Sequence, residues 1–207
     1  MSSANGVWPV LPPHGSGQRI GLLGGSFNPP HEGHRLISEI ALRRLHLDAV
    51  WWLVTPGNPL KDAGELEPMS QRIARARAVA AHPRIHVTAV EADVGVSRTR
   101  DTLRFLTRRC PTVRFVWLMG ADNLADFHRW HAWREIASMV PIAVIDRPGY
   151  TIHGATGAAA AWLGPYRFDE SDAPKLALAA PPAWIFLHGR RSAMSSTELR
   201  NLARLPN

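Results

Sequence analysis

The sequence predicts an α/β fold, a doubly wound, Rossmann-like parallel sheet with helices on both faces. Short apolar runs rich in Val, Ile, Leu and Trp alternate along the chain with segments of helical character. Most of these runs are continuous rather than alternating between apolar and polar residues, which is typical of strands covered on both faces. Polar or glycine-rich residues follow the runs, as expected where ligands bind beyond the carboxyl ends of parallel strands.

Six apolar runs are the expected strands, and four segments between them are the expected helices. The strands are 19–23, 49–55, 85–90, 113–119, 141–145 and 183–187. The helices are 32–45, 68–81, 99–109 and 130–139. A last helix is expected to begin at Ser195, because Ser195 and Glu198 have the spacing of a capping box. The segment 153–182 has little periodicity, and we interpret it as a long connection or a small excursion.

Local sequence supports the first two helices. In the first, apolar side chains recur at helical spacing and form one stripe. They are Leu36, Ile37, Ile40 and Leu45. In the second, Pro68 suits the first turn, where a backbone N–H has no partner within the helix.

Length and composition predict one domain that binds an anion. Residues 1–18 are expected to be a flexible N-terminal leader, and 19–207 a single domain. The formal net charge of +7 suggests either nucleic acid or a small phosphorylated substrate as partner. Basic clusters on the expected helices, such as 72–77, are interpreted as solvated faces. No apolar run approaches the length that crosses a membrane, and the single cysteine, Cys110, fits a reducing cytosol.

The segment from Gly24 to His34 has the outline of a phosphate site. It reads Gly-Gly-Ser-Phe-Asn-Pro-Pro-His-Glu-Gly-His and directly follows the first apolar run. Glycines let a backbone approach an anion closely, and the helix that follows offers unpaired N–H groups and a positive dipole end. His31 and His34 are three residues apart, so at the start of a helix they share one face. The alternative is an ordinary turn followed by a surface helix with two solvated histidines.

Informative residues also follow the other expected strands. They occur at 55–61, 97–103, 120–122, 147–149 and 195–200. The first of these segments is a rigid, proline-rich turn that ends in Lys61. Because parallel strands end at one edge of a sheet, we expect these segments to surround one ligand site.

Together these segments resemble the nucleotidyltransferase superfamily with a His-x-Gly-His signature, and more closely its bacterial nicotinate-nucleotide adenylyltransferases. The motifs follow the family's order: Gly-Gly-Ser-Phe-Asn-Pro-x-His-x-Gly-His at 24–34, a proline-rich turn ending in lysine at 56–61, Ser-x-Thr-x-Asp-Thr-Leu at 97–103, Gly120 and Asp122 with Trp130 downstream, Arg-Pro-Gly at 147–149, and Ser-Ser-Thr-x-x-Arg at 195–200. The first and last motifs are typical of the superfamily and the middle ones of this family. The chain departs from the family's commoner pattern at Asn28, Leu60 and Arg98.

The resemblance implies transfer of the adenylyl group of ATP to nicotinate mononucleotide. The products are nicotinate adenine dinucleotide and pyrophosphate, in a cytoplasmic step of NAD biosynthesis. The substrate's own phosphate oxygen is the nucleophile, so alignment and charge stabilisation carry the reaction. Mg²⁺ is expected to bridge phosphate oxygens, with no ligand from a protein side chain.

The resemblance also implies a role for individual residues. The expected catalytic residues are His31, His34 and Arg200. The expected ATP-binding residues are Gly24, Gly25, Ser26, Phe27, His31, His34, Asp122, Ser196, Thr197 and Arg200. The expected mononucleotide-binding residues are Asn28, Lys61, Thr99, Trp130 and Arg147. Asp122 is expected at the adenosine ribose and Trp130 on the pyridine ring, and the histidines are expected as imidazolium ions because a triphosphate raises their pKa.

Other interpretations remain open from the sequence. The two histidines could ligate zinc in a metal-dependent hydrolase, and Asp101 is expected to cap its helix rather than bind a ligand. Trp133 is assigned to the core and Trp130 to the site. The first and last motifs also suit a sister enzyme, phosphopantetheine adenylyltransferase or a cytidylyltransferase. The basic charge suits a nucleic-acid-binding module.

Overall fold

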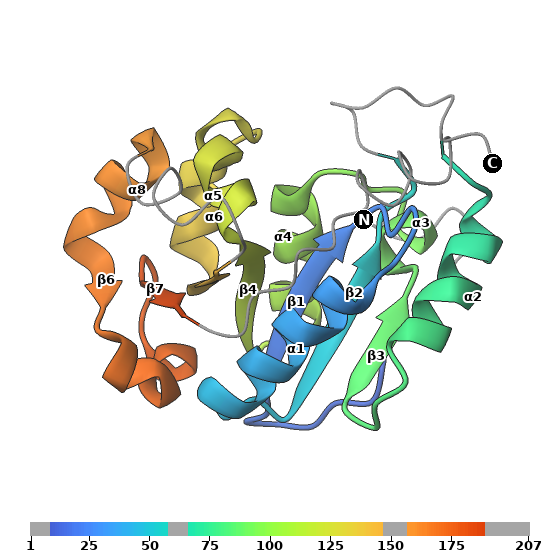
Figure 1. Ribbon diagram of the computed structural model, residues 1–207, viewed down its shortest axis with the longest axis horizontal. Helices are drawn as coiled ribbons and strands as arrows, with labels where there is room; N and C mark the ends of the chain where they lie inside the picture. The colour runs from blue at the N-terminus through green and yellow to red at the C-terminus, as the bar shows by residue number, and fades with distance from the viewer. Residues whose placement is uncertain (1–8, 58–65, 147–156, 189–207) are drawn as a thin grey trace, which may run out of the picture.

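A seven-stranded sheet, parallel throughout, forms the centre of the molecule. The computed structural model describes residues 9–57, 66–146 and 157–188 (Figure 1). The strands are β1 (Arg19–Gly25), β2 (Ala49–Val54), β3 (Ile85–Thr88), β4 (Arg114–Gly120), β5 (Ile142–Ile145), β6 (Arg167–Phe168) and β7 (Trp184–Leu187). Their order across the sheet is β3-β2-β1-β4-β5-β7-β6. Since each neighbouring pair is parallel, the carboxyl ends lie at one edge.

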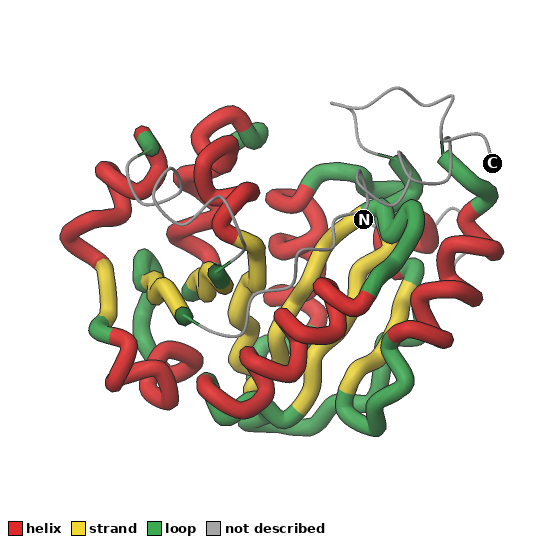
Figure 2. The backbone as a smooth tube through the Cα atoms, in the orientation of Figure 1, coloured by secondary structure: helices red, strands yellow, loops and turns green. Residues whose placement is uncertain are grey.

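Helices cover both faces of this sheet (Figure 2). The α-helices are α1 (Glu32–Arg44), α2 (Met69–Val79), α3 (Val90–Asp93), α4 (Thr99–Arg109), α5 (Ala121–Asp126), α6 (Trp133–Met139) and α8 (Ala158–Leu163). Three 3₁₀ segments complete the described elements: η2 (Phe127–Arg129), η3 (Gly164–Tyr166) and η4 (Glu170–Leu178). Within the described ranges, no helix has both the length and the apolar character needed to span a bilayer.

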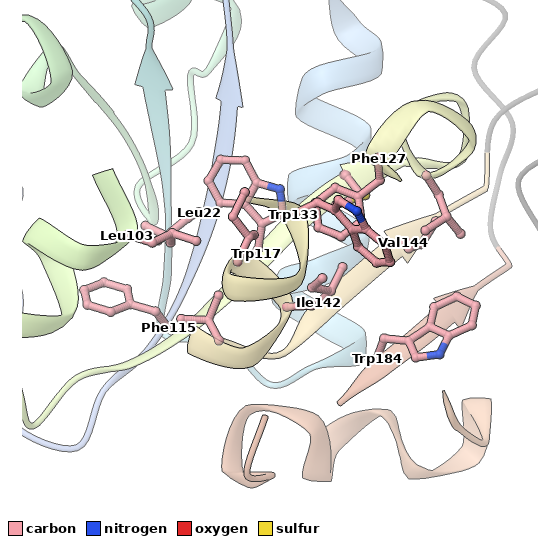
Figure 3. Packing of buried hydrophobic residues seen from close by; sticks show 14 of the residues in the cluster. Leu22, Leu103, Phe115, Trp117, Phe127, Trp133, Ile142, Val144 and Trp184 are labelled. Atoms are coloured by element: carbon pink, nitrogen blue, oxygen red, sulfur yellow. The ribbon is translucent and has the colours of Figure 1, made fainter. Parts of the chain in front are cut away.

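The sheet separates two apolar cores because alternate strand residues point to opposite faces. One core joins α4, α5, α6 and α8 to strand residues such as Leu22, Trp117 and Ile142 (Figure 3). The other joins α1, α2 and η4 to strand residues such as Leu23 and Trp52. The predicted doubly wound parallel sheet with helices on both faces is confirmed, and so is the packing role of the strand tryptophans: Trp51, Trp52, Trp117 and Trp184 are all buried.

The strand order reverses at β1, and this reversal positions the site. The chain builds β1, β2 and β3 outward in one direction and then places β4 on the other side of β1. Gly25 is in register with Val54 of β2, and Leu23 is in register with Leu118 of β4. The loops that follow β1 and β4 therefore leave the sheet side by side. In open parallel sheets a crevice for ligands forms at this switch point.

The expected strands and helices are present with small shifts at their ends. Pro68 is the N-cap residue of α2 rather than a residue of its first turn. The expected strand 85–90 ends at Thr88, whose hydroxyl accepts a hydrogen bond from the backbone N–H of Val90 at 3.2 Å. That bond turns the chain into α3, a one-turn helix too short to show a sequence period. The expected helix 130–139 begins at Trp133. The helix expected to begin at Ser195 lies outside the described residues.

The interpretation of 153–182 as a connection is wrong for its described part. Residues 157–182 contain α8, η3, the edge strand β6 and η4. Strand β6 has only two residues, and η4 contains Pro174, so neither has a length or period that a sequence pattern can reveal. The segment completes the sheet with β6 and contributes to both faces, since α8 packs in one core and η4 in the other.

Residues 9–18, part of the expected flexible leader, contact the domain. The N–H of Gly17 donates to the carbonyl oxygen of Thr112 at 2.9 Å. The ring of His14 meets the edge of Trp51, with ring centroids 5.6 Å apart. The buried thiol of Cys110 lies 3.4 Å from Nε2 of the same histidine, and burial raises the pKa of that thiol. A raised pKa keeps Cys110 as an unreactive thiol.

Candidate active site

Strand β1 has, as its next-to-last residue, a glycine that packing requires. A Cβ atom on Gly24 would lie 2.7 Å from Cη2 and 3.2 Å from Cζ2 of the Trp117 indole. The indole is buried in the core on one face of the sheet. A side chain at position 24 would therefore force either Trp117 or the end of β1 to shift. Packing against Trp117 thus accounts for the glycine at position 24, and the close approach of an anion there stays a prediction.

Phe27 turns the loop and fixes it to the sheet. Its φ of 48° lies in the left-handed region, which costs a non-glycine residue about 1–3 kcal/mol. The ring is buried, stacks on Trp52 with centroids 4.9 Å apart, and meets the ring of His34 at 4.7 Å. Burying a phenylalanine side chain stabilises by about 2 kcal/mol, which offsets the backbone strain. Phe27 is therefore a packing residue that sets the direction of the chain before α1.

The two histidines form a capping box at the start of α1. His31 is the N-cap residue, with extended backbone, and His34 is the third residue of the helix. Nδ1 of His31 accepts the N–H of Gly33 at 3.1 Å, and Nδ1 of His34 accepts the N–H of His31 at 3.2 Å. The ring centroids are 3.8 Å apart. The expectation that both rings share one side of the helix start is confirmed, whereas the alternative of two solvated side chains is wrong, because His31 is 3% exposed.

These two bonds determine which nitrogen of each ring carries hydrogen. A nitrogen that accepts a hydrogen bond holds a lone pair, so Nδ1 is unprotonated in both rings. Each imidazole is then neutral in this arrangement, with its hydrogen on Nε2 at the opposite edge of the ring. An imidazolium would have to break its bond to the backbone. The helix start therefore holds both rings through Nδ1 and leaves Nε2 at the outer edge of each ring, while the imidazolium form next to a bound triphosphate stays a prediction.

Asn28 links this loop to the segment that precedes α2. Its side chain is buried, and its Oδ1 accepts the backbone N–H of Glu67 at 3.3 Å. An aspartate at this position would bring a buried negative charge next to the histidines, whereas the amide accepts the same bond without charge. Asn28 therefore holds two loops of the carboxyl edge together.

A row of aromatic rings lies behind the loop that follows β4. Trp130 makes edge-to-face contacts with Trp117 and with Phe127, at centroid distances of 6.2 and 5.4 Å. Trp133 is buried beside Phe127, which confirms its assignment to the core (Figure 3). Trp130 is half-buried and packs against the same core. Trp117 contacts Trp130 and also packs against Gly24, near the end of β1. Trp130 therefore lies on the side of β1 that leads into the loop with the histidines.

The start of α4 differs from the expected capping. Arg98 is the N-cap residue and its side chain makes no capping bond, while Thr99 is the first helical residue and is half-buried. Asp101, expected as the cap, pairs with Arg100, with Nη2 and Oδ1 2.8 Å apart. The capping expectation is wrong because Asp101 is the third residue of the helix and not the residue before it. Its charge still suits the first turn of a helix.

The comparisons with known proteins agree on one family. A family model described as cytidylyltransferase-like matches residues 22–202. A probable nicotinate-nucleotide adenylyltransferase of Methylorubrum extorquens (strain PA1) is 59% identical over 182 residues, which cover 88% of this chain and 98% of that protein. A protein of the same description from Brucella abortus (strain 2308) is 57% identical over 88% of this chain and 94% of its own length. The chain belongs to the nicotinate-nucleotide adenylyltransferase family.

A solved structure from the same family has the same fold. Plasmodium falciparum nicotinic acid mononucleotide adenylyltransferase complexed with NaAD matches with a TM-score of 0.67 at 17% identity, covering 89% of this chain and 83% of that one. At this identity the likeness concerns the fold alone. The relatives of 57–59% identity thus confirm the family expected from the motifs, and this solved structure confirms the architecture.

The residues expected from the family fall into two groups. One group lies at or beside the switch point, at the end of β1 or on the segments that follow β1 and β4: Gly24, Gly25, Ser26, Phe27, Asn28, His31, His34, Asp122 and Trp130. Asp122 is half-buried in the first turn of α5, directly after β4. Thr99 begins α4 on the face covered by α5 and α6. The other group lies outside the described residues: Lys61, Arg147, Ser196, Thr197 and Arg200.

Glu91 is a buried carboxyl that sequence reasoning missed. It lies on α3, is 4% exposed, and its Oε1 accepts the hydroxyl of Thr102 at 2.8 Å. Burial raises the pKa of Glu91, and hydrogen bonds from Thr102 and Thr55 oppose that shift in part. The carboxyl thus connects the end of β2 with the first turns of α4. No sequence signal marks it, because a single glutamate in a one-turn helix resembles any surface residue.

Glu91→Gln should remove a pH dependence of folding stability. A carboxyl whose pKa is raised by folding binds its proton more tightly in the folded state, so stability falls as pH rises from the ordinary value through the raised one. The free energy of unfolding is measured by denaturant titration at about pH 5 and about pH 8. Relative to the wild type, that of the variant should be higher at pH 8 than at pH 5. Glu135→Gln, on the exposed face of α6, is the control and should not change the slope. Parallel curves for Glu91→Gln and wild type would contradict the raised pKa.

Proposed function

We propose that the chain transfers the adenylyl group of ATP to nicotinate mononucleotide. A phosphate oxygen of the mononucleotide attacks the α-phosphorus of ATP. The bond between the α-phosphorus and the bridging oxygen breaks, and pyrophosphate leaves with the electron pair. The observation that carries this proposal is identity of 57–59% over nearly the whole length of relatives described as probable nicotinate-nucleotide adenylyltransferases. The histidine capping box at the switch point supports it, because phosphates bind at such helix starts.

The capping box supplies charge stabilisation without a protein nucleophile. Nε2–H groups of His31 and His34 would donate to phosphate oxygens of ATP, and their positions are fixed before the substrate binds. Asp122 would accept from the ribose of the adenosine, and Trp130 would stack on the pyridine ring. Thr99 would contact the pyridine carboxylate through its backbone.

Five further roles rest on the family motif alone. Lys61 and Arg147 would contact the phosphate of the mononucleotide, and Ser196, Thr197 and Arg200 would hold the β- and γ-phosphates and the leaving pyrophosphate. Both groups are donors or cations, as the transfer of a phosphorus centre between anionic oxygens requires. All five residues lie outside the described residues.

Mg²⁺ fits this site as a partner of the nucleotide. In the described part of the chain, no group of three or more His, Cys, Asp or Glu is placed to enclose a metal ion. Mg²⁺ retains water and binds phosphate oxygens readily, so the triphosphate itself would hold most of its coordination. When bound, it would neutralise charge on the phosphates. The side chains at the helix start would then need to donate hydrogen bonds rather than carry negative charge.

A pyrophosphate-release assay tests the function. ATP and Mg²⁺ are supplied with nicotinate mononucleotide, nicotinamide mononucleotide or phosphopantetheine in parallel reactions. We expect turnover with nicotinate mononucleotide, a lower rate with the amide and none with phosphopantetheine. No turnover with either mononucleotide would overturn the proposal, and turnover with phosphopantetheine would favour the sister enzyme.

Two control reactions address the other classes of function. A zinc chelator added with excess Mg²⁺ should leave the rate unchanged, whereas loss of activity would favour the metal-dependent hydrolase. Tight binding to DNA or RNA that weakens steeply with salt, without pyrophosphate release, would favour the nucleic-acid-binding module.

A further inference from the structure

A buried arginine lies between the loops of the carboxyl edge. Arg72 is on α2 and is 2% exposed. Its Nη1 donates to the carbonyl oxygens of Ser26 at 2.7 Å and Thr55 at 2.9 Å. Its Nε donates to the carbonyl oxygen of Glu67 at 2.9 Å, and Nη2 makes a longer contact of 3.5 Å with that of Pro56. One guanidinium therefore bonds to backbone from three separate segments.

The position of these acceptors explains what the guanidinium does. The N–H of Thr55 donates to the carbonyl oxygen of Gly25 at 3.0 Å, which continues the β1–β2 ladder one residue beyond β2. Just after this bond the two segments leave the sheet, and the ladder no longer pairs their carbonyl groups. The Nη1 atom of Arg72 binds the next carbonyl on each side, those of Ser26 and Thr55. It thereby holds the two segments at a fixed spacing beyond the last hydrogen bond of the β1–β2 ladder.

The energetics indicate a specific requirement rather than ordinary packing. Burial lowers the pKa of Arg72, and the charge of Glu67 opposes that shift. An arginine stays charged even so, and a buried cation is costly unless its donors are bonded. The four acceptors are neutral carbonyl oxygens, so the planar fork of donors matters more than the charge. A lysine at this position would offer donors from one nitrogen and could not reproduce the fork.

A neighbouring arginine on the same helix shows the contrast. Arg75 pairs with the side chain of Glu67, with Nη1 and Oε1 2.7 Å apart, and its side chain is 54% exposed. Such an exposed pair contributes little to stability. Arg72 binds the backbone carbonyl of the same glutamate, and the backbone N–H of that residue donates to Asn28 in the histidine loop. The buried contact therefore connects α2 with the loop after β1 and the loop after β2.

We propose that Arg72 is a positioning residue that fixes the loop after β1 relative to the loop after β2 and so aligns the two substrates for in-line attack. The proposal rests on the proposed function. The histidine loop faces the triphosphate, and the loop after β2 leads into the turn assigned to the mononucleotide. A change in their spacing would leave each half of the site able to bind. It would move the attacking oxygen off the line to phosphorus, and small misplacements of this kind reduce rates strongly.

The test compares matched variants of the two arginines in the intact chain. Arg72→Lys should lower kcat about tenfold or more while each KM changes by less than about threefold, because alignment and not binding is lost. Arg72→Met fills the space without a donor and should have a still lower kcat. Arg75→Lys is the control and should keep both constants within about twofold of wild type. The melting temperature of each variant is measured, and assays are run well below the lowest one.

Each result bears on the proposal. A positioning role is supported if kcat falls from wild type to Arg72→Lys and again to Arg72→Met while KM stays nearly constant. The lysine then keeps part of the rate because it keeps part of the donors. Variants that melt earlier but keep the wild-type kcat would show a merely structural role and overturn it. Failure of both variants to fold would overturn it as well, because the guanidinium would then be a requirement of folding. An inactive wild type would instead contradict the proposed function and is recognised in the same assay.

Discussion

His34→Asn should lower kcat by about 10²–10³-fold and leave the melting temperature almost unchanged. The Oδ1 atom of asparagine occupies nearly the same place as Nδ1 of histidine, so it can still accept the N–H of His31. The capping box is then kept, and with it about 1 kcal/mol of helix stability. What the variant loses is the Nε2–H donor at the far edge of the ring. The expected loss of rate follows from removing one positioned donor to the phosphates.

His34→Gln is the complementary variant, because its amide nitrogen reaches approximately to the position of Nε2. It should keep more of the rate than asparagine but lose the bond to the backbone of His31, and with it some stability. The measurement is steady-state pyrophosphate release together with thermal unfolding for both variants. Equal losses of rate for the two would mean that a ring, and not its Nε2–H, is needed. A near wild-type rate for His34→Asn would show that His34 has no role in catalysis.

A matched control for the backbone bond exists elsewhere in the chain. Nδ1 of His82 accepts the N–H of Arg84 at 3.1 Å, which is the same kind of bond. It lies just before β3, at the opposite edge of the sheet from the histidine loop. His82→Asn should change neither the rate nor the melting temperature noticeably. A loss of rate in this variant would show that the assay responds to small structural changes far from the site.

The spacing of the two histidines predicted their proximity but not their protonation. A spacing of three positions at a helix start places two side chains on one face, so the sequence sufficed for that step. The capping role was not predictable, because the residues usually found at an N-cap are Ser, Thr, Asp and Asn. The tautomer follows from hydrogen bonds of about 3 Å, which only the folded backbone defines. The imidazolium form expected beside a bound triphosphate stays a prediction.

The fold was predictable where side-chain patterns extend over a whole element. Strands β1, β2 and β4 are continuous apolar runs, and the sheet buries them on both faces as such runs require. Strand β6 has two residues and η4 has a proline inside it, so no pattern was available. The expectation that the basic cluster 72–77 is solvated is wrong for Arg72, which is buried. Its burial depends on carbonyl groups from loops distant in sequence.

Trp130→Ala should raise the KM for nicotinate mononucleotide by about 10–100-fold, with little change in kcat or in the KM for ATP. Stacking of an aromatic ring on a base contributes about 1–3 kcal/mol, and a contact made equally in the ground and transition states appears in KM. Trp130→Phe should recover most of the affinity, because it keeps a ring in the same place. Substrate titrations at saturating ATP measure the effect.

Trp162→Ala separates stacking from packing. Trp162, on α8, is also half-buried on the same core. Its ring contacts are with Trp133, at a centroid distance of 5.2 Å, and with Tyr166, whereas Trp130 contacts Trp117 and Phe127. Both alanine variants remove a large ring and should lose similar stability, so a general loosening of the core would raise KM in both. A rise confined to Trp130→Ala assigns the ring to the substrate. An equal rise in KM for both variants would show that Trp130 is a core residue, which packs edge-on against Phe127 and Trp117.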